Sequence, residues 1–183
     1  MKFLKMVLSM LSLTGITSCG SLRPCPITTG TTKIVYGEHA NSGIAISTTY
    51  EITGDSLVWD YRELRNDCHL RDVARYDAQD FETLVTALSK IRFSAKDAHD
   101  YSSGGSGWGC SFDNEKGHYL QYNSTYALSG DYAKVTEMIL QFAEAHKPEG
   151  LRLFDALKAE PHEKPTFGEF EELPEALKPY TVK

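Results

Sequence analysis

The stretch IAISTTYEITGDSLVWDY, residues 44–61, contains the strand and turn pattern on which the fold prediction rests. From Ile44 to Ile52, larger side chains alternate with small or polar ones, which is typical of a strand with one buried face. Residues 53–56 (Thr-Gly-Asp-Ser) then form a turn signal. After the turn, Leu57, Trp59 and Tyr61 face one way, so the stretch predicts an antiparallel hairpin.

Further elements are expected on both sides of this hairpin. Residues 33–36 are a short strand candidate, and a weaker, more charged strand is expected through Leu70, Val73 and Tyr76. Asp77 is placed to cap a helix. The apolar stripe of that helix consists of Phe81, Leu84, Val85, Leu88 and Ile91.

A second hairpin and a second helix follow the first helix. One strand carries Trp108, Cys110 and Phe112, a turn is expected at residues 114–117, and the partner strand covers residues 118–122. The second helix begins near residues 129–131 and ends before residue 148, which is a proline. Its apolar positions are Tyr132, Val135, Met138, Ile139 and Phe142. A short third helix is expected at residues 151–157.

The order of these elements predicts one α+β domain over residues 33–158, an antiparallel sheet with its two main helices packed on one face. This pattern, together with the Asp-Phe-Glu-x-Leu opening of the first helix at residues 80–84, resembles the body of small uncharacterised lipoproteins of Bacteroidetes. The resemblance covers roughly residues 43–146 and implies no catalytic residues.

The N-terminal residues are typical of an export signal. Lys2 and Lys5 give residues 1–18 a positively charged start, and an apolar run follows over residues 6–16. This run is too short to span a bilayer, which needs roughly 20 apolar residues. Residues 16–19 (Ile-Thr-Ser-Cys) resemble the lipobox of bacterial lipoproteins. The resemblance implies cleavage before Cys19, acylation of its thiol and attachment to a membrane through that lipid. Simple secretion with an unmodified Cys19 is the alternative.

The residues after Cys19 bear on localisation. Gly20 and Ser21 follow, and the absence of an aspartate there favours the periplasmic face of the outer membrane in the enterobacterial sorting pattern. Residues 19–32 are rich in Ser, Pro, Thr and Gly and are expected to form a flexible tether. Cleavage before Cys19 would remove Lys2 and Lys5 but no acidic residue, so the formal charge would change from −6 to −8. Such a negative charge disfavours nucleic acid as a partner.

The C-terminal tail, residues 159–183, is rich in Pro and Glu. Apolar residues interrupt it at a spacing that would put them on one side of a short helix, namely Phe167, Phe170, Leu173 and Leu177. Two interpretations remain open. The tail either packs on the body or a partner, or it is a mobile terminus.

The envelope permits disulfides, and three cysteines remain once Cys19 is acylated. Cys68 and Cys110 both lie in the expected body, so we predict a structural Cys68–Cys110 bridge, with Cys25 left in the tether. The alternative is that all three thiols stay reduced.

No recognised catalytic or metal-binding motif is present. The histidines and cysteines show neither His-Glu-x-x-His nor Cys-x-x-Cys spacing, so no metal or cofactor is expected. The glycine-rich residues 103–107 lack the Gly-Lys-Ser/Thr ending of a phosphate loop. Asp97, His99 and Asp100, close to this loop and to Ser102, are the one polar cluster that would suit hydrolysis or metal binding. A solvated loop surface is the alternative.

Aromatic residues suggest a binding surface. Trp59 and Tyr61 on the first hairpin, with Trp108, Tyr119 and Tyr122 on the second, are expected to form an aromatic patch on the sheet face that the helices leave open. The alternative is that the rings form the core under the helices. Two functions follow: a non-catalytic binding or inhibitory module for an envelope protein, peptide or glycan, or an envelope hydrolase acting through Asp97, His99 and Ser102.

Overall fold

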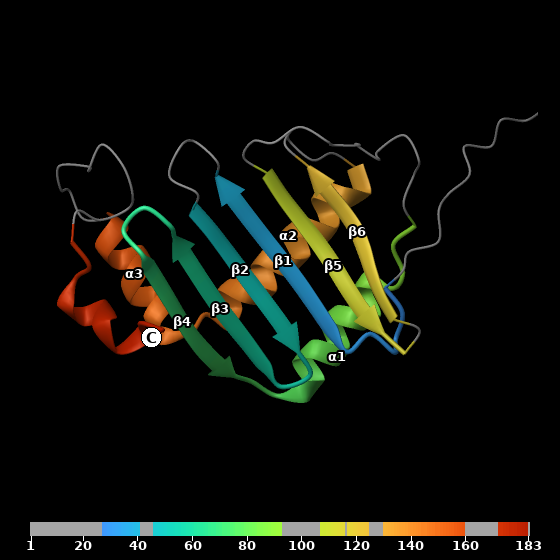
Figure 1. Ribbon diagram of the computed structural model, residues 1–183. Coiled ribbons are helices and arrows are strands. Elements are labelled where there is room, and N and C mark those ends of the chain that lie inside the picture. The colour runs from blue at the N-terminus through green and yellow to red at the C-terminus, as the bar shows by residue number, and fades with distance from the viewer. Residues whose placement is uncertain are drawn as a thin grey trace, which may run out of the picture.

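The computed structural model describes residues 27–40, 46–92, 107–115, 117–124, 130–159 and 172–182. Within these residues, six strands form one antiparallel sheet in the order β4-β3-β2-β1-β5-β6 (Figure 1). The strands are β1 (Lys33–Ala40), β2 (Ile46–Thr53), β3 (Ser56–Glu63), β4 (Cys68–Arg75), β5 (Gly107–Asn114) and β6 (Gly117–Ser124).

The predicted hairpin forms the β2–β3 pair. Tyr50 lies opposite Trp59, and the chain reverses at Gly54 and Asp55, as the turn signal indicates. The weaker strand prediction is confirmed by β4, which extends this meander to one edge of the sheet. The chain then returns through the first helix to β5, which pairs with the other side of β1. β1 is therefore an interior strand, longer than the four residues expected from the sequence.

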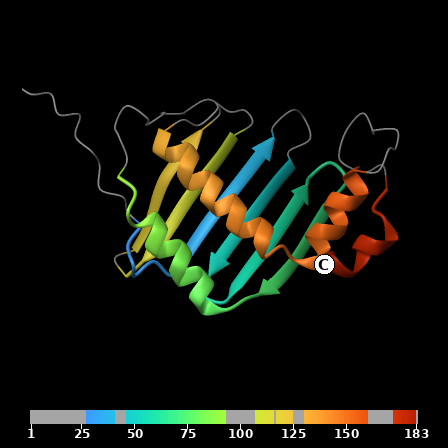
Figure 2. The same ribbon diagram turned by 180° about the vertical axis from the view of Figure 1, so that it is seen from behind.

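Three described helices accompany the sheet: α1 (Ala78–Leu88), α2 (Gly130–Ala145) and α3 (Glu149–Ala159). Asp77 caps α1 as predicted, because its side chain accepts a hydrogen bond from the Gln79 backbone N–H at 2.9 Å. α1 and α2 lie on one face of the sheet, behind it in Figure 1 and in front of it in Figure 2. The predicted fold class, α+β with the helices on one face of an antiparallel sheet, is confirmed.

The hydrophobic core lies between the sheet and these helices. Near α3, the ring of Phe154 lies 5.4 Å from that of Trp59 and 4.6 Å from that of Tyr61. The other large buried side chains of the sheet are Ile34, Tyr36, Ile52, Leu57, Leu70 and Phe112. The helices contribute Phe81, Leu84, Val85, Leu88, Val135, Ile139 and Leu151. Burying this apolar area is the main term that stabilises the fold.

The folded body extends beyond residues 33–158 at its N-terminal side. Ile27 is buried in the core, and the Thr32 backbone N–H donates to the Asp113 carbonyl at 2.9 Å. The prediction of a flexible tether over residues 19–32 is therefore wrong for residues 27–32, because Ile27 has a hydrophobic site to fill. Composition alone does not reveal that site.

The end of the tail also belongs to the body. Leu177 is fully buried in the 3-10 helix η2 (Glu175–Tyr180), and Leu173 packs partly against the core. Thr181 bridges to Leu70, and the Val182 backbone N–H donates to the His69 carbonyl at 2.9 Å. The described end of the tail thus packs along the β4 edge, while Phe167 and Phe170 lie outside the described residues. None of the described helices is both long and apolar enough to cross a bilayer.

Candidate functional site

The sheet face opposite α1 and α2 carries no helix within the described residues (Figures 1 and 2). We call it the open face. Side chains alternate along each strand, so the neighbours of buried Trp59, namely Val58 and Asp60, lie on the open face. Its other members on β2, β3 and β4 include Ser47, Thr49, Glu51, Arg62, His69 and Arg71.

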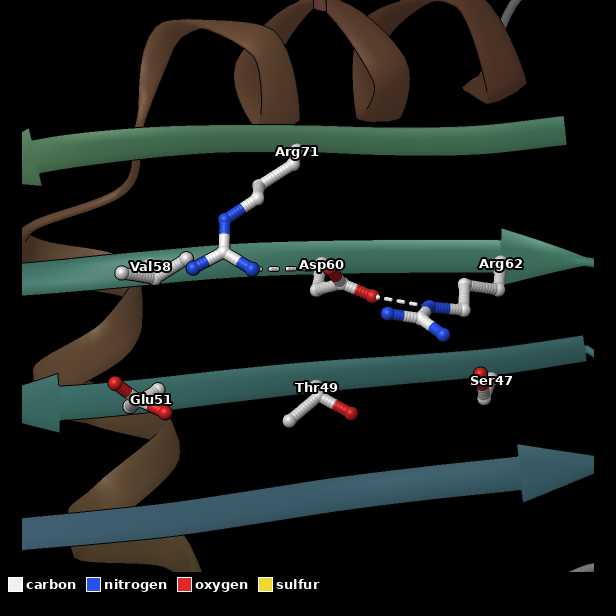
Figure 3. Close-up of a pocket in the computed structure, with 7 residues that line it drawn as sticks. All are labelled: Ser47, Thr49, Glu51, Val58, Asp60, Arg62 and Arg71. Atoms are coloured by element: carbon white, nitrogen blue, oxygen red, sulfur yellow. Dashed lines mark hydrogen bonds and ion pairs between the residues drawn. The ribbon is translucent and has the colours of Figure 1, made fainter. Parts of the chain in front are cut away.

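A hollow of about 330 Å³ lies on the open face over β2, β3 and β4 (Figure 3). Its lining consists of Ser47, Thr49, Glu51, Val58, Asp60, Arg62 and Arg71. A second hollow of about 340 Å³ adjoins it, because Ser47 and Thr49 line both. Gly37 and Gly109 line the second hollow. Because glycine has no side chain, nothing projects from the sheet at these two positions.

Asp60 is the centre of a polar cluster that forms part of the lining of the first hollow. Its carboxylate accepts a hydrogen bond from Arg62 Nε at 2.9 Å and contacts His69 Nε2 at 2.8 Å and Arg71 Nη1 at 3.6 Å. The strand register explains the convergence, since Asp60 lies opposite Arg71, and Arg62 lies opposite His69. We call these four residues the arginine cluster.

The pKa of Asp60 indicates which form of the carboxyl is present. Burial by itself would raise this pKa, since the Asp60 side chain is only 15% exposed. Hydrogen bonds from His69 and Arg62 to the carboxylate outweigh that effect, and the pKa lies below its ordinary value of 3.8. Asp60 is therefore ionised at neutral and mildly acidic pH. It suits holding cations in place better than donating a proton.

The arginine cluster is suited to binding anions. Arg62 and Arg71 contact Asp60 through one nitrogen each, and their side chains are 54% and 49% exposed. Further guanidinium N–H groups are thus available to a ligand, in the planar geometry that matches carboxylates and phosphates. No group of three or more His, Cys, Asp and Glu suited to a metal ion occurs in the described part of the chain.

The predicted aromatic patch does not form as expected. Trp59 and Tyr61 are 0% and 2% exposed and lie under α3, so the prediction that they belong to an open binding face is wrong. They share one face, but it is the face that the helices cover. Trp108, Tyr119 and Tyr122 belong to β5 and β6, and their side chains lie outside what the structure describes.

The predicted Cys68–Cys110 disulfide is also wrong, since neither cysteine forms a disulfide. Cys68 lies on β4 and Cys110 on β5, and three strands separate them in the sheet. Strand spacings of about 4.8 Å put them roughly 19 Å apart, well beyond the reach of a disulfide. Cys19, Cys25, Asp97, His99 and Ser102 lie outside the described residues.

Sequence reasoning missed the arginine cluster. Its signal was the row of charged residues that includes Asp60, Arg62 and Arg71, but charge only weakened the strand prediction through Leu70, Val73 and Tyr76. On two paired strands with a known register, Asp60, Arg62, His69 and Arg71 fall on one face.

Comparisons with known proteins give no family for this chain. No family model matches it, and no curated protein or solved structure matches it. The α+β fold and its open face therefore provide the basis for a functional assignment.

Proposed function

We propose that the protein is a lipid-anchored lipoprotein of the bacterial envelope whose folded body is a non-catalytic binding or inhibitory module. Its anchor is the lipid on Cys19, at the periplasmic face of the outer membrane. The partner is an envelope protein, a peptide or a glycan. The observation that carries the binding role is the open face, where two exposed arginines line a polar hollow.

The chemistry of the arginine cluster supports binding over catalysis. Asp60 is ionised and engaged by cations, so it is a poor general acid. Its ordered contacts with Arg62 and His69 fix donors in position before a ligand arrives, which lowers the entropy lost on binding.

The anchor also limits where the open face can act. Ile27 is already part of the body, so residues 19–26 are what remains of the predicted tether. Eight residues reach at most about 28 Å when fully extended. A partner of the open face would therefore be met close to the membrane surface.

Metabolic labelling tests the anchor. Cells expressing the wild-type chain should incorporate radioactive palmitate into the protein, and Cys19→Ala should abolish the label. Cys25→Ala is the matched control, since it removes a nearby thiol outside the lipobox, and it should stay labelled. Label retained by Cys19→Ala would refute the anchor.

Crosslinking in living cells tests the binding role. A photoreactive phenylalanine analogue placed at Thr49 or Val58 reports on the hollow, and the same analogue at Glu82 or Thr86 of α1 reports on an exposed helix surface. We expect discrete adducts, identified by mass spectrometry, from the open-face positions alone. Equal adducts from both surfaces, or none from the open face, would contradict the proposal.

A further inference from the structure

We propose that the hollow on the open face binds a carboxylate-rich peptide segment, with Arg62 and Arg71 as the groups that recognise its acidic side chains. This inference rests on the proposed binding role and names the ligand class. It is carried by the charge, the geometry and the shape of the open face.

Charge distinguishes the arginine cluster from the chain as a whole. The chain has a formal charge of −6, whereas in the arginine cluster two guanidiniums contact a single carboxylate. Glu51, which lies opposite Val58 and also lines the hollow, is 4.0 Å from Lys33. An acidic ligand is thus attracted to the arginine cluster and repelled by much of the remaining surface.

The geometry of the two arginines suits neighbouring carboxylates. Arg62 and Arg71 approach Asp60 from opposite sides (Figure 3). Because both contact the same carboxylate, their guanidiniums are close enough for acidic side chains at nearby positions of one peptide. Acidic residues two apart in an extended chain project on the same side, as these contacts require.

The shape of the open face favours an extended chain over a compact anion. The first hollow shares Ser47 and Thr49 with the second hollow, so a shallow trough runs from β4 towards β5. The two hydroxyl groups can hydrogen-bond to peptide carbonyl and amide groups. A small anion would use only the arginine end of this trough.

Calorimetry on the full chain, purified in a non-ionic detergent, tests the inference. The probe is a capped heptapeptide of alternating Gly and Glu, and its Gln counterpart is the control ligand. We expect the Glu peptide to bind and the Gln peptide to bind at least tenfold more weakly. Arg62→Gln with Arg71→Gln should weaken binding of the Glu peptide at least tenfold.

Arg75→Gln with Arg152→Gln is the matched control variant. It removes the same two charges from exposed arginines that do not line the hollow, and it should change the affinity less than twofold. Circular dichroism checks that both double variants are folded. Equal losses in the two variants, or no binding of the Glu peptide, would overturn the inference.

Inorganic phosphate separates a peptide site from a small-anion site. If phosphate binds as tightly as the Glu peptide and with the same dependence on Arg62 and Arg71, the assignment to a peptide is wrong. The crosslinking experiment separates the two proposals. Open-face adducts that survive Arg62→Gln with Arg71→Gln would refute only the acidic ligand, whereas their absence from the wild type would refute the binding role itself.

Discussion

The Leu177→Ala substitution tests whether the C-terminal segment is a structural part of the fold. Leu177 is fully buried, although it lies six residues from the end of the chain and far in sequence from β4, the strand that η2 contacts. Leu177→Ala removes three carbon groups, worth about 2.4 kcal/mol at about 0.8 kcal/mol each. The cavity left behind adds to this, so we expect a loss of about 3 kcal/mol in the free energy of unfolding.

Urea unfolding of the full chain, followed by tryptophan fluorescence and circular dichroism, measures this loss. With a slope of about 1.5 kcal/mol per molar urea, the midpoint should fall by roughly 2 M while the slope stays unchanged. Val182→Ala is the control within the same segment, because Val182 is 42% exposed and should cost less than about 0.5 kcal/mol.

The comparison of the two variants is decisive. If Leu177→Ala costs no more than Val182→Ala, the C-terminal segment is only loosely attached and the reasoning from burial fails. A total stability of about 5–15 kcal/mol leaves the Leu177→Ala protein folded in water, so the difference is measurable.

Three further predictions concern other parts of the molecule. Because the pKa of Asp60 is lowered in the folded protein, its ionised form stabilises the fold above the ordinary pKa of 3.8, and this contribution is lost as the pH falls through the folded value. Asp60→Asn should therefore lower the free energy of unfolding, measured with urea, by about 1 kcal/mol at pH 6 and by less at pH 3. The same decrease at both pH values would contradict this prediction. Cys68 and Cys110 should both be alkylated after denaturation without reductant, as read from the mass of the protein, and an unmodified pair would indicate a disulfide. Alanine at position 150 would place a Cβ 2.8 Å from the Tyr180 ring, so Gly150→Ala should be destabilising in the wild type. It should be neutral or stabilising in a Tyr180→Ala background, and the same cost in both backgrounds would disprove the contact.

The elements that sequence analysis predicted well depend on local patterns. The Ile44–Tyr61 stretch contains both strands of a hairpin and its turn, and the α1 stripe lies next to its capping residue, Asp77. The interior position of β1 was not predictable in this way. β1 pairs with β5, whose residues lie more than 60 positions further along the chain, and no short-range pattern specifies that pairing.

The candidate site shows a second limit of sequence reasoning. Alternation indicates that Trp59 and Tyr61 share a face, but it does not say which face the helices cover. The arginine cluster depends on the register between β3 and β4, which aligns Asp60 with Arg71. That register is set by pairing across a turn, so the residues of the cluster cannot be brought together by their spacing alone.

The division between the two faces of the sheet determines which substitutions are informative about function. The helices need an apolar surface, so the large rings lie beneath them, and the face left open is polar. Replacing Trp59 by Ala would cost about 3–5 kcal/mol, and any loss of binding would then reflect unfolding. Arg62 and Arg71 are exposed and contribute little to stability, so their replacement changes the charge of the hollow while the core stays intact. Loss of binding on replacing these two arginines can therefore be attributed to recognition.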